Sequence, residues 1–105
     1  MITVEFVTGF QSFVNATQEM INEYYQNSFP NNTVPKIEYE EGRKYIRVIS
    51  NSGPYNRSVF CFVDKTTGDV YKAASWKVPA KHVRGNIFRG NIKEYLTPYG
   101  AQYLR

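Results

Sequence analysis

Ser58-Val59-Phe60-Cys61-Phe62-Val63 is the most apolar strand-like run in the chain. Its apolar residues are continuous rather than alternating, a pattern typical of a strand that is covered on both faces. We therefore predict that residues 58–63 form the central strand of a sheet. Cys61 is the chain's only cysteine, and within such a run we expect a buried, inert thiol rather than a nucleophile.

Two segments before this strand alternate apolar and polar side chains, as half-buried strands do. The first is residues 37–39, which a turn at Glu41-Gly42 follows. The second is residues 44–50, with Ile46 and Val48 on one face. Its other face is expected to carry Tyr45, Arg47 and Ile49.

A tight hairpin connection is predicted after the central strand, at residues 64–69, where Gly68 is available for a positive φ. Residues 70–74 then return as a further strand. Because the connections are short, these segments predict a meander of antiparallel strands.

The N-terminal part predicts a strand and then a helix. Residues 2–6 alternate apolar and polar side chains, the period of a half-buried strand. Thr8 then suits a helix N-cap, with Gln11 at the capping-box spacing. We expect an amphipathic helix of about 18 residues that ends within residues 27–32, where Pro30 is the breaker. Its apolar stripe consists of Phe10, Phe13, Val14, Met20, Ile21 and Tyr24.

The regularity weakens beyond Trp76. Pro79, Gly85 and Gly90 indicate an irregular segment, and a capping-type spacing predicts a short helix that begins near Asn91. We therefore predict one α+β domain over residues 1–105. One long N-terminal amphipathic helix packs on a 3–5-stranded antiparallel sheet, and an irregular basic C-terminal segment with a short helix follows.

Positive charge is concentrated in the last third of the chain. Residues 1–71 carry six Lys or Arg against eight Asp or Glu, a net charge of −2. Residues 72–105 carry seven against Glu94 alone, a net charge of +6, so the two parts sum to the +4 of the whole. This asymmetry points to an anionic partner.

The string Arg-Gly-Asn-Ile occurs twice in this basic segment, at 84–87 and 89–92. Each copy supplies a guanidinium, a backbone that a phosphate can approach and an adaptable amide. We hypothesise that the segment binds nucleic acid or another polyanion, with Trp76 as a stacking platform. The predicted binding residues are Lys72, Trp76, Lys77, Lys81, Arg84, Arg89 and Lys93. The alternative is a solvated basic surface, in which Gly and Asn serve turns and caps and Trp76 belongs to the core.

Enzyme signatures are absent from the sequence. His82 is the only histidine and Cys61 the only cysteine, so the common zinc sites cannot be built. No G-x-S-x-G, P-loop or dinucleotide fingerprint occurs. Asp64 and Asp69 are interpreted as turn residues that bond their own backbone, since Val70 stands where an acid-x-Lys nuclease triplet needs its carboxylate. We predict no enzyme, no metal and no cofactor.

Residues 64–80, which read DKTTGDVYKAASWKVPA, and the following Arg84-Gly85-Asn86-Ile87 resemble short uncharacterised proteins of tailed bacteriophages and environmental viral sequences. The resemblance implies a viral origin and no particular mechanism. A single cysteine excludes an internal disulfide framework. No stretch approaches the roughly 20 apolar residues of a membrane span. We therefore expect a cytoplasmic protein, in the host cytoplasm if it is viral, and no membrane partner.

Two functional hypotheses follow from the sequence. The first is a small viral accessory protein that binds nucleic acid, single- or double-stranded, or another polyanion. The second is a protein–protein interaction module, a homo-oligomer or a binder of a host factor, with exposed Tyr and Trp at the contact. In a homo-oligomer, the acidic residues Glu38, Glu40 and Glu41 would pair with the basic segment of a second copy.

Overall fold

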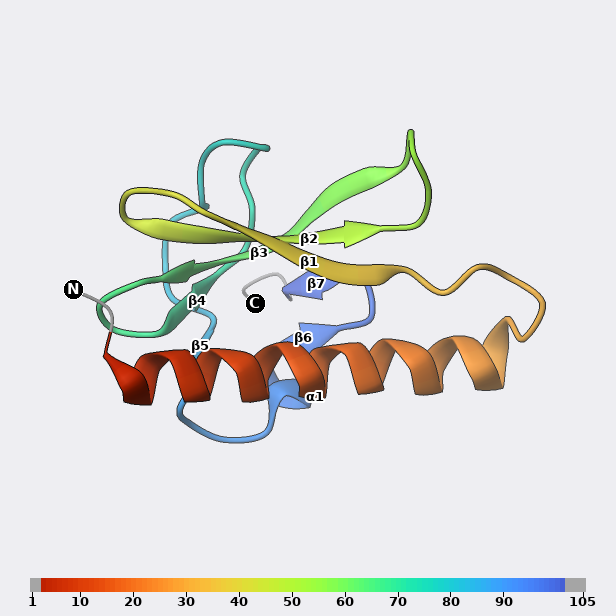
Figure 1. Ribbon diagram of the computed structural model, residues 1–105, viewed down its shortest axis with the longest axis horizontal. Coiled ribbons are helices and arrows are strands. Elements are labelled where there is room, and N and C mark those ends of the chain that lie inside the picture. The colour runs from red at the N-terminus through yellow and green to blue at the C-terminus, as the bar shows by residue number, and fades with distance from the viewer. Residues whose placement is uncertain (1–2, 102–105) are drawn as a thin grey trace.

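The computed structural model describes residues 3–101, in which one long helix lies along one face of a five-stranded antiparallel sheet (Figure 1). The sheet order follows the chain order, so it is a meander with β3 in the middle. Its strands are β1 (Lys36–Glu41), β2 (Tyr45–Asn51), β3 (Arg57–Asp64), β4 (Asp69–Tyr71) and β5 (Gly85–Asn86). The α+β prediction and the central strand are confirmed.

The N-terminal strand prediction is wrong, because α1 (Val4–Ser28) begins within the predicted strand. Thr3, and not Thr8, is the N-cap, and its hydroxyl accepts a hydrogen bond from the Phe6 N–H at 3.0 Å. Phe6 continues the buried helical stripe by one turn, so burial overrides the local alternation. The helix therefore has 25 residues instead of about 18, and it ends in the predicted region. Ile2 lies outside the described residues.

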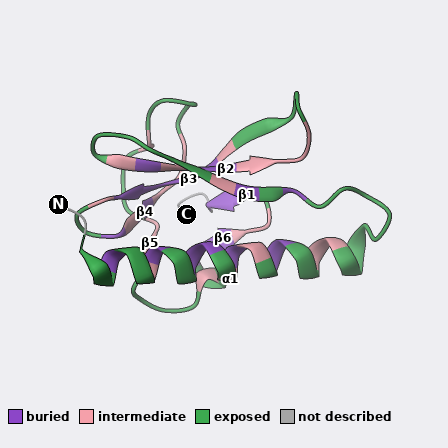
Figure 2. Cartoon of the chain, in the orientation of Figure 1, coloured by how far each residue is buried: buried purple, intermediate pink, exposed green. Residues whose placement is uncertain are grey.

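The main core fills the space between α1 and the sheet (Figure 2). A β-bulge in β3 allows two consecutive residues to join it: Val48 pairs with Cys61 and Ile49 with Val59, so Phe60 is the extra residue. Phe60 and Cys61 both lie in the core, and burial raises the pKa of the Cys61 thiol. The expected burial of this thiol is confirmed. Phe62 is also buried, on the opposite face of the sheet.

The C-terminal part packs back between α1 and the sheet (Figure 1). It contains a single 3-10 turn, η1 (Ile92–Glu94), and a small hairpin of β6 (Leu96–Thr97) and β7 (Gly100–Ala101). The predicted short helix is this one turn, and Asn91 is its N-cap. β7 passes β3 so closely that a Cβ on Gly100 would lie 2.8 Å from the Phe60 carbonyl oxygen. Gly100 also has a φ of +132°, so both its space and its backbone favour glycine.

Candidate nucleic-acid interface

The basic residues after β4 lie in a loop, residues 72–84, on the sheet face opposite α1 (Figure 1). Its first half is a tight turn, because the N–H groups of Ala74 and Ser75 both donate to the Val78 carbonyl, at 2.9 and 3.1 Å. The Ala80 N–H donates to the Lys72 carbonyl at 2.7 Å and closes the base. This part of the predicted irregular segment is thus ordered by its own backbone, with Trp76 near the tip.

Trp76 lies against two arginines that come from the sheet. The Arg47 guanidinium lies 5.1 Å from the centre of the indole and the Arg57 guanidinium 5.6 Å from it, both within cation–π range. Arg47 Nε also donates to the Trp76 carbonyl at 2.7 Å. The indole remains 39% exposed, so Trp76 is a surface residue flanked by guanidinium groups and not a core residue.

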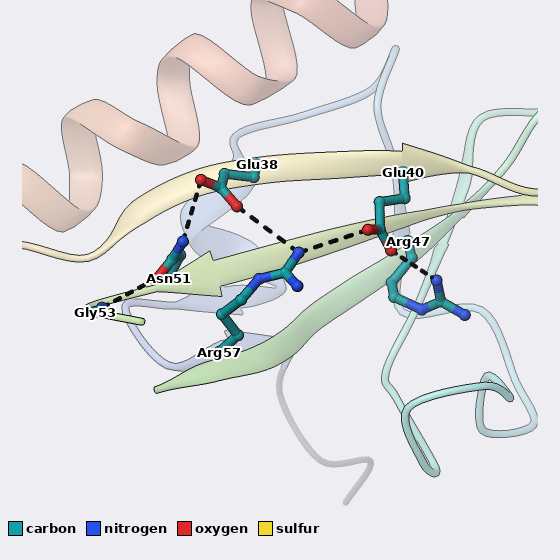
Figure 3. A network of polar contacts seen from close by, with 6 residues as sticks. All are labelled: Glu38, Glu40, Arg47, Asn51, Gly53 and Arg57. Atoms are coloured by element: carbon teal, nitrogen blue, oxygen red, sulfur yellow. Dashed lines mark hydrogen bonds and ion pairs between the residues drawn. The ribbon is translucent and has the colours of Figure 1, made fainter. Parts of the chain in front are cut away.

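Carboxylates of β1 hold both arginines in place (Figure 3). Arg47 Nη1 lies 3.0 Å from Glu40 Oε1, and Arg57 Nη2 lies 3.5 Å from Glu40 and 3.8 Å from Glu38. Glu38 also accepts a hydrogen bond from Asn51 at 3.2 Å. We call Glu38, Glu40, Arg47, Arg57 and Trp76 the outer-face network.

The acidic cluster is therefore neutralised within the chain. Glu38 and Glu40 pair in the outer-face network, and Glu41 pairs with Lys65 at 3.1 Å. By contrast, Lys77 and Lys81 are exposed and form no ion pair within residues 3–101. The positive charge next to the network is thus left uncompensated by the part of the chain that the structure describes.

The two Asn residues of the doubled Arg-Gly-Asn-Ile string form the same kind of side-chain turn. Asn86 Oδ1 accepts from the Phe88 N–H at 2.8 Å, and Asn91 Oδ1 accepts from the Lys93 N–H at 2.9 Å, so each Asn caps the residue two positions later. The isoleucine after each Asn then packs against the core. The Gly and Asn of the string have structural roles, as the alternative interpretation expects.

The two glycines of the string are required for different reasons. A Cβ on Gly85 would lie 2.4 Å from the ring of Tyr95, and Gly90 has a φ of +68°. Burial raises the pKa of Tyr95 to about 12, and its hydroxyl donates to the Asn86 carbonyl at 3.3 Å. The first copy of the string therefore packs on the buried Tyr95 ring, through Gly85 and the Asn86 carbonyl.

The arginines of the string face one polar pocket of about 400 Å³, lined in part by Arg84, Arg89, Asp69 and Glu94. Arg84 Nη1 donates to the carbonyls of Lys81 and His82, at 2.8 and 2.6 Å. His82 has a φ of +74°, uncommon for a residue other than glycine, and lies in the turn that Arg84 closes. Arg84 thus has a structural role besides its place in the pocket.

The predicted binding residues do not converge on one surface. Trp76 and Lys77 adjoin the outer-face side of β2, and Arg84 and Arg89 line the polar pocket. Lys93 lines a groove between the end of α1 and β6, with Met20, Tyr24 and Leu96 among its neighbours. Lys72 is half-buried at the base of the loop, and Lys81 is exposed near its end. Arg105, the remaining basic residue of the last third, lies outside the described residues.

Arg47 and Arg57 are the functional candidates that the sequence did not reveal. Both belong to the first 71 residues, whose net charge is negative, so the charge count pointed away from them. The sequence offers one local indication of this role: the arginines occur in or directly before predicted strands, at positions that face away from the core, as Glu38 and Glu40 do. Only the sheet register brings them next to Trp76.

Asp64 is a turn residue, as predicted. Its Oδ1 accepts hydrogen bonds from the Thr66 N–H and hydroxyl, at 2.8 and 2.7 Å, and from the Thr67 N–H at 3.2 Å. Burial by itself raises the pKa of Asp64, but these hydrogen bonds outweigh it and lower the pKa. Within residues 3–101, no group of three or more His, Cys, Asp and Glu side chains is placed to hold a metal ion. No helix in that range is long and apolar enough to cross a membrane.

Comparison with known proteins gives one match. The family of unknown function DUF7717 matches residues 5–101 of the chain. No curated protein and no solved structure matches it. The match covers most of the chain and carries no description of an activity, so the geometry is the basis for a functional proposal.

Proposed function

The chain belongs to DUF7717, a family of unknown function, and we propose that it binds nucleic acid or another polyanion through the outer face of its sheet. The observation that carries this proposal is the indole of Trp76 within cation–π range of the guanidiniums of Arg47 and Arg57, with exposed Lys77 and Lys81 in the same loop.

Aromatic rings and guanidinium planes are the two kinds of side chain on which unpaired bases stack. The outer-face network presents both kinds together, on a part of the molecule where Trp76 is 39% exposed. Ion pairs with Glu38 and Glu40 hold the guanidiniums in place before a ligand arrives, which reduces the ordering cost of binding.

Lys77 and Lys81 supply the charge that this face needs for a polyanion. Arg47 and Arg57 are offset by the two carboxylates, so the two lysines provide the local excess. Exposed lysines contact phosphates and release counterions, which makes such binding sensitive to salt. The resemblance of residues 64–87 to short phage proteins supports a viral accessory protein that acts in the cytoplasm of an infected cell.

Fluorescence anisotropy with labelled single- and double-stranded oligonucleotides tests this proposal. We expect binding at about 50 mM salt that weakens steeply toward about 200 mM. Lys77→Ala and Lys81→Ala are each expected to weaken binding and to reduce the salt dependence by about one counterion. Lys93→Ala is the matched control, because it removes the same charge from an exposed residue that lines the groove between α1 and β6 and not the outer face.

Two results would overturn the proposal. One is the absence of binding to either kind of oligonucleotide at low salt. The other is an equal loss of affinity in Lys93→Ala, since net charge and not the outer face would then govern association.

A second candidate, a protein–protein interaction module, is favoured by exposed apolar side chains at the start of α1. Val4 is 82% and Val7 57% exposed, and they lie one helical turn apart. Phe88 is also exposed and packs against Phe6 with a centroid distance of 6.3 Å. Light scattering of the wild type and of Val4→Asp distinguishes the two functions. An oligomeric wild type and a monomeric Val4→Asp variant would favour this candidate.

A further inference from the structure

We propose that the polar pocket of Arg84, Arg89, Asp69 and Glu94 binds a nucleotide by its terminal phosphate. The ligand is either a free nucleoside monophosphate or the phosphorylated end of a strand. This inference deepens the nucleic-acid function proposed above and rests on it. It assigns strand ends to the pocket and the continuous backbone to the outer face.

The pocket has the size of a small-molecule site. Its volume is about 400 Å³, within the range of roughly 300–1,000 Å³ that is typical for ligand pockets. Buried Tyr95 lines it, and Gly85 lies directly against the Tyr95 ring. The Tyr95 ring and Gly85 form part of the wall of a pocket that is open to solvent, so a phosphate at a chain end can enter it.

A five-residue step brings three charged side chains into this pocket: Arg84, Arg89 and Glu94. The two Asn turns and the core-packed isoleucines of the doubled string set this step, so the chain returns to the pocket wall after each copy. The repeat thereby accounts for the presence of two arginines in one site.

The arginines provide a fixed and an adaptable guanidinium. Arg84 is held by the carbonyls of Lys81 and His82, which sets its position in advance. Arg89 is exposed, and its side chain makes no hydrogen bond or ion pair within residues 3–101, although two carboxylates line the same pocket. Guanidinium donors are arranged to bind phosphate oxygens in pairs, so a phosphate in this pocket would meet the donors of Arg89.

The two carboxylates of the pocket favour a ligand that carries hydrogen-bond donors besides its phosphate. Asp69 Oδ1 already accepts from Asn86 Nδ2 at 3.0 Å, and Glu94 lies over Gly90, 3.3 Å from where a Cβ would stand. Ionised carboxylates are pure acceptors, so they repel a bare phosphate and favour N–H and O–H donors. A nucleotide carries a phosphate together with ribose hydroxyls and base N–H groups, which matches two arginines and two carboxylates in one pocket.

Titration calorimetry with the full chain tests the assignment with four probes. These are a single-stranded oligonucleotide with a 5′-phosphate, the same oligonucleotide with a 5′-hydroxyl, a nucleoside 5′-monophosphate, and inorganic phosphate. We expect the terminal phosphate to tighten oligonucleotide binding by roughly tenfold. We also expect the monophosphate to bind more tightly than inorganic phosphate, because only the monophosphate meets the carboxylates.

Four variants locate the effect. Arg89→Ala is expected to abolish the advantage of the 5′-phosphate, and Arg89→Lys to restore part of it. Glu94→Gln is expected to reduce the preference for the monophosphate over inorganic phosphate. Lys77→Ala is expected to weaken the binding of both oligonucleotides equally, so that the 5′-phosphate still tightens binding by the same factor. Circular dichroism of each variant verifies its fold, and Arg89 is exposed enough that its replacement is tolerated.

The outcomes separate this inference from the proposed function. Equal binding of both oligonucleotides, with no binding of the monophosphate, overturns the pocket and leaves the outer face standing. Binding of the monophosphate without binding of either oligonucleotide overturns the function proposed for the outer face and supports the pocket. An advantage of the 5′-phosphate that survives in Arg89→Ala overturns the assignment to this pocket.

Discussion

Single polar residues of this chain acquire roles that their neighbours in sequence do not reveal. Thr17 and Gln18 are adjacent on α1, yet Thr17 is fully buried and Gln18 bonds to the chain before β1. Asp64 closes a turn and is almost fully buried as well. Each case follows from the position of the side chain in the fold, and each can be tested by one substitution.

Thr17→Val is expected to raise the free energy of unfolding by about 1 kcal/mol, because it replaces an unsatisfied buried hydroxyl by a methyl of the same shape. Thr17 is 0% exposed, and its Oγ1 has no hydrogen-bond partner among residues 3–101. Urea unfolding measures the change. Thr17→Ala is the control: it also removes the hydroxyl but leaves a small cavity, so it should not stabilise. A loss of stability in Thr17→Val would show that the hydroxyl is bonded.

Asp64 makes the stability depend on acid pH. Its folded-state pKa is lowered, so its carboxylate stabilises the fold above the unfolded-state value of about 4. That contribution is lost as the pH falls through the lowered folded-state pKa. We expect Asp64→Asn to destabilise at pH 7 by about 2 kcal/mol, with a smaller difference at pH 2. Urea unfolding at both pH values tests this, with the exposed Glu19→Gln as control. A difference at pH 2 as large as that at pH 7 would contradict it.

A few side-chain hydrogen bonds, besides the packing of the core, hold the helix and the sheet together. Gln18, on the polar side of the helical pattern, accepts from the Ile37 N–H at 2.7 Å and donates to the Pro35 carbonyl at 3.0 Å. It thus attaches α1 to the start of the edge strand β1. The periodicity of the helix predicts its buried face, but a single bond from its polar side is not visible in that pattern.

Gln18→Ala is expected to destabilise the protein by about 1–2 kcal/mol, because two backbone groups lose their partner. It should also speed hydrogen exchange at the Ile37 amide, which local opening of β1 exposes. Gln11→Ala is the matched control, since Gln11 is exposed and its side chain bonds, within the described part of the chain, only to Asn15 on the same helix. Equal effects of the two substitutions would show that α1 is not attached to β1 by Gln18.

At the scale of the whole molecule, residues from three strands and a distant loop meet around Trp76. Arg47 is the central contact, because it touches Glu40, the Trp76 ring and the Trp76 carbonyl. The segments that meet are separated by up to 38 positions, from Glu38 to Trp76. Their assembly decides whether the lysines of the loop adjoin an aromatic surface.

Trp76 is the only tryptophan, so its emission reports on this assembly. We expect Arg47→Ala to shift the emission to longer wavelength. The substitution removes a guanidinium that covers the indole and a hydrogen bond that attaches the loop to the sheet, so the indole becomes more exposed to water. The far-ultraviolet circular dichroism should be unchanged, since the contact lies outside the main core. Arg43→Ala, an exposed arginine at the β1–β2 turn, is the control. An unchanged emission in Arg47→Ala would show that the loop holds its place by itself.

The sequence by itself determined the α+β class, the order of the strands along the chain, the central apolar strand and the helical stripe. The helical stripe repeats every three to four residues, the flanking strands alternate every two, and the central strand is a continuous apolar run, so the local pattern records them. It also determined that Gly68 turns the hairpin and that Asn91 caps a turn, because each depends on its immediate neighbours. The tertiary structure alone decided that residues 4–6 are helical, since the burial of Phe6 outweighs the local alternation.

The tertiary structure also decided the candidate sites. Whether Glu38 and Glu40 face solvent or an arginine depends on sheet register, and whether Arg84 and Arg89 share a pocket depends on two turns and a buried Tyr95. Ion pairs and pockets join residues far apart in the chain, so no local pattern encodes them. The physical reason is that electrostatic contacts depend on distance in space, whereas a periodic pattern describes only the order of residues along the chain.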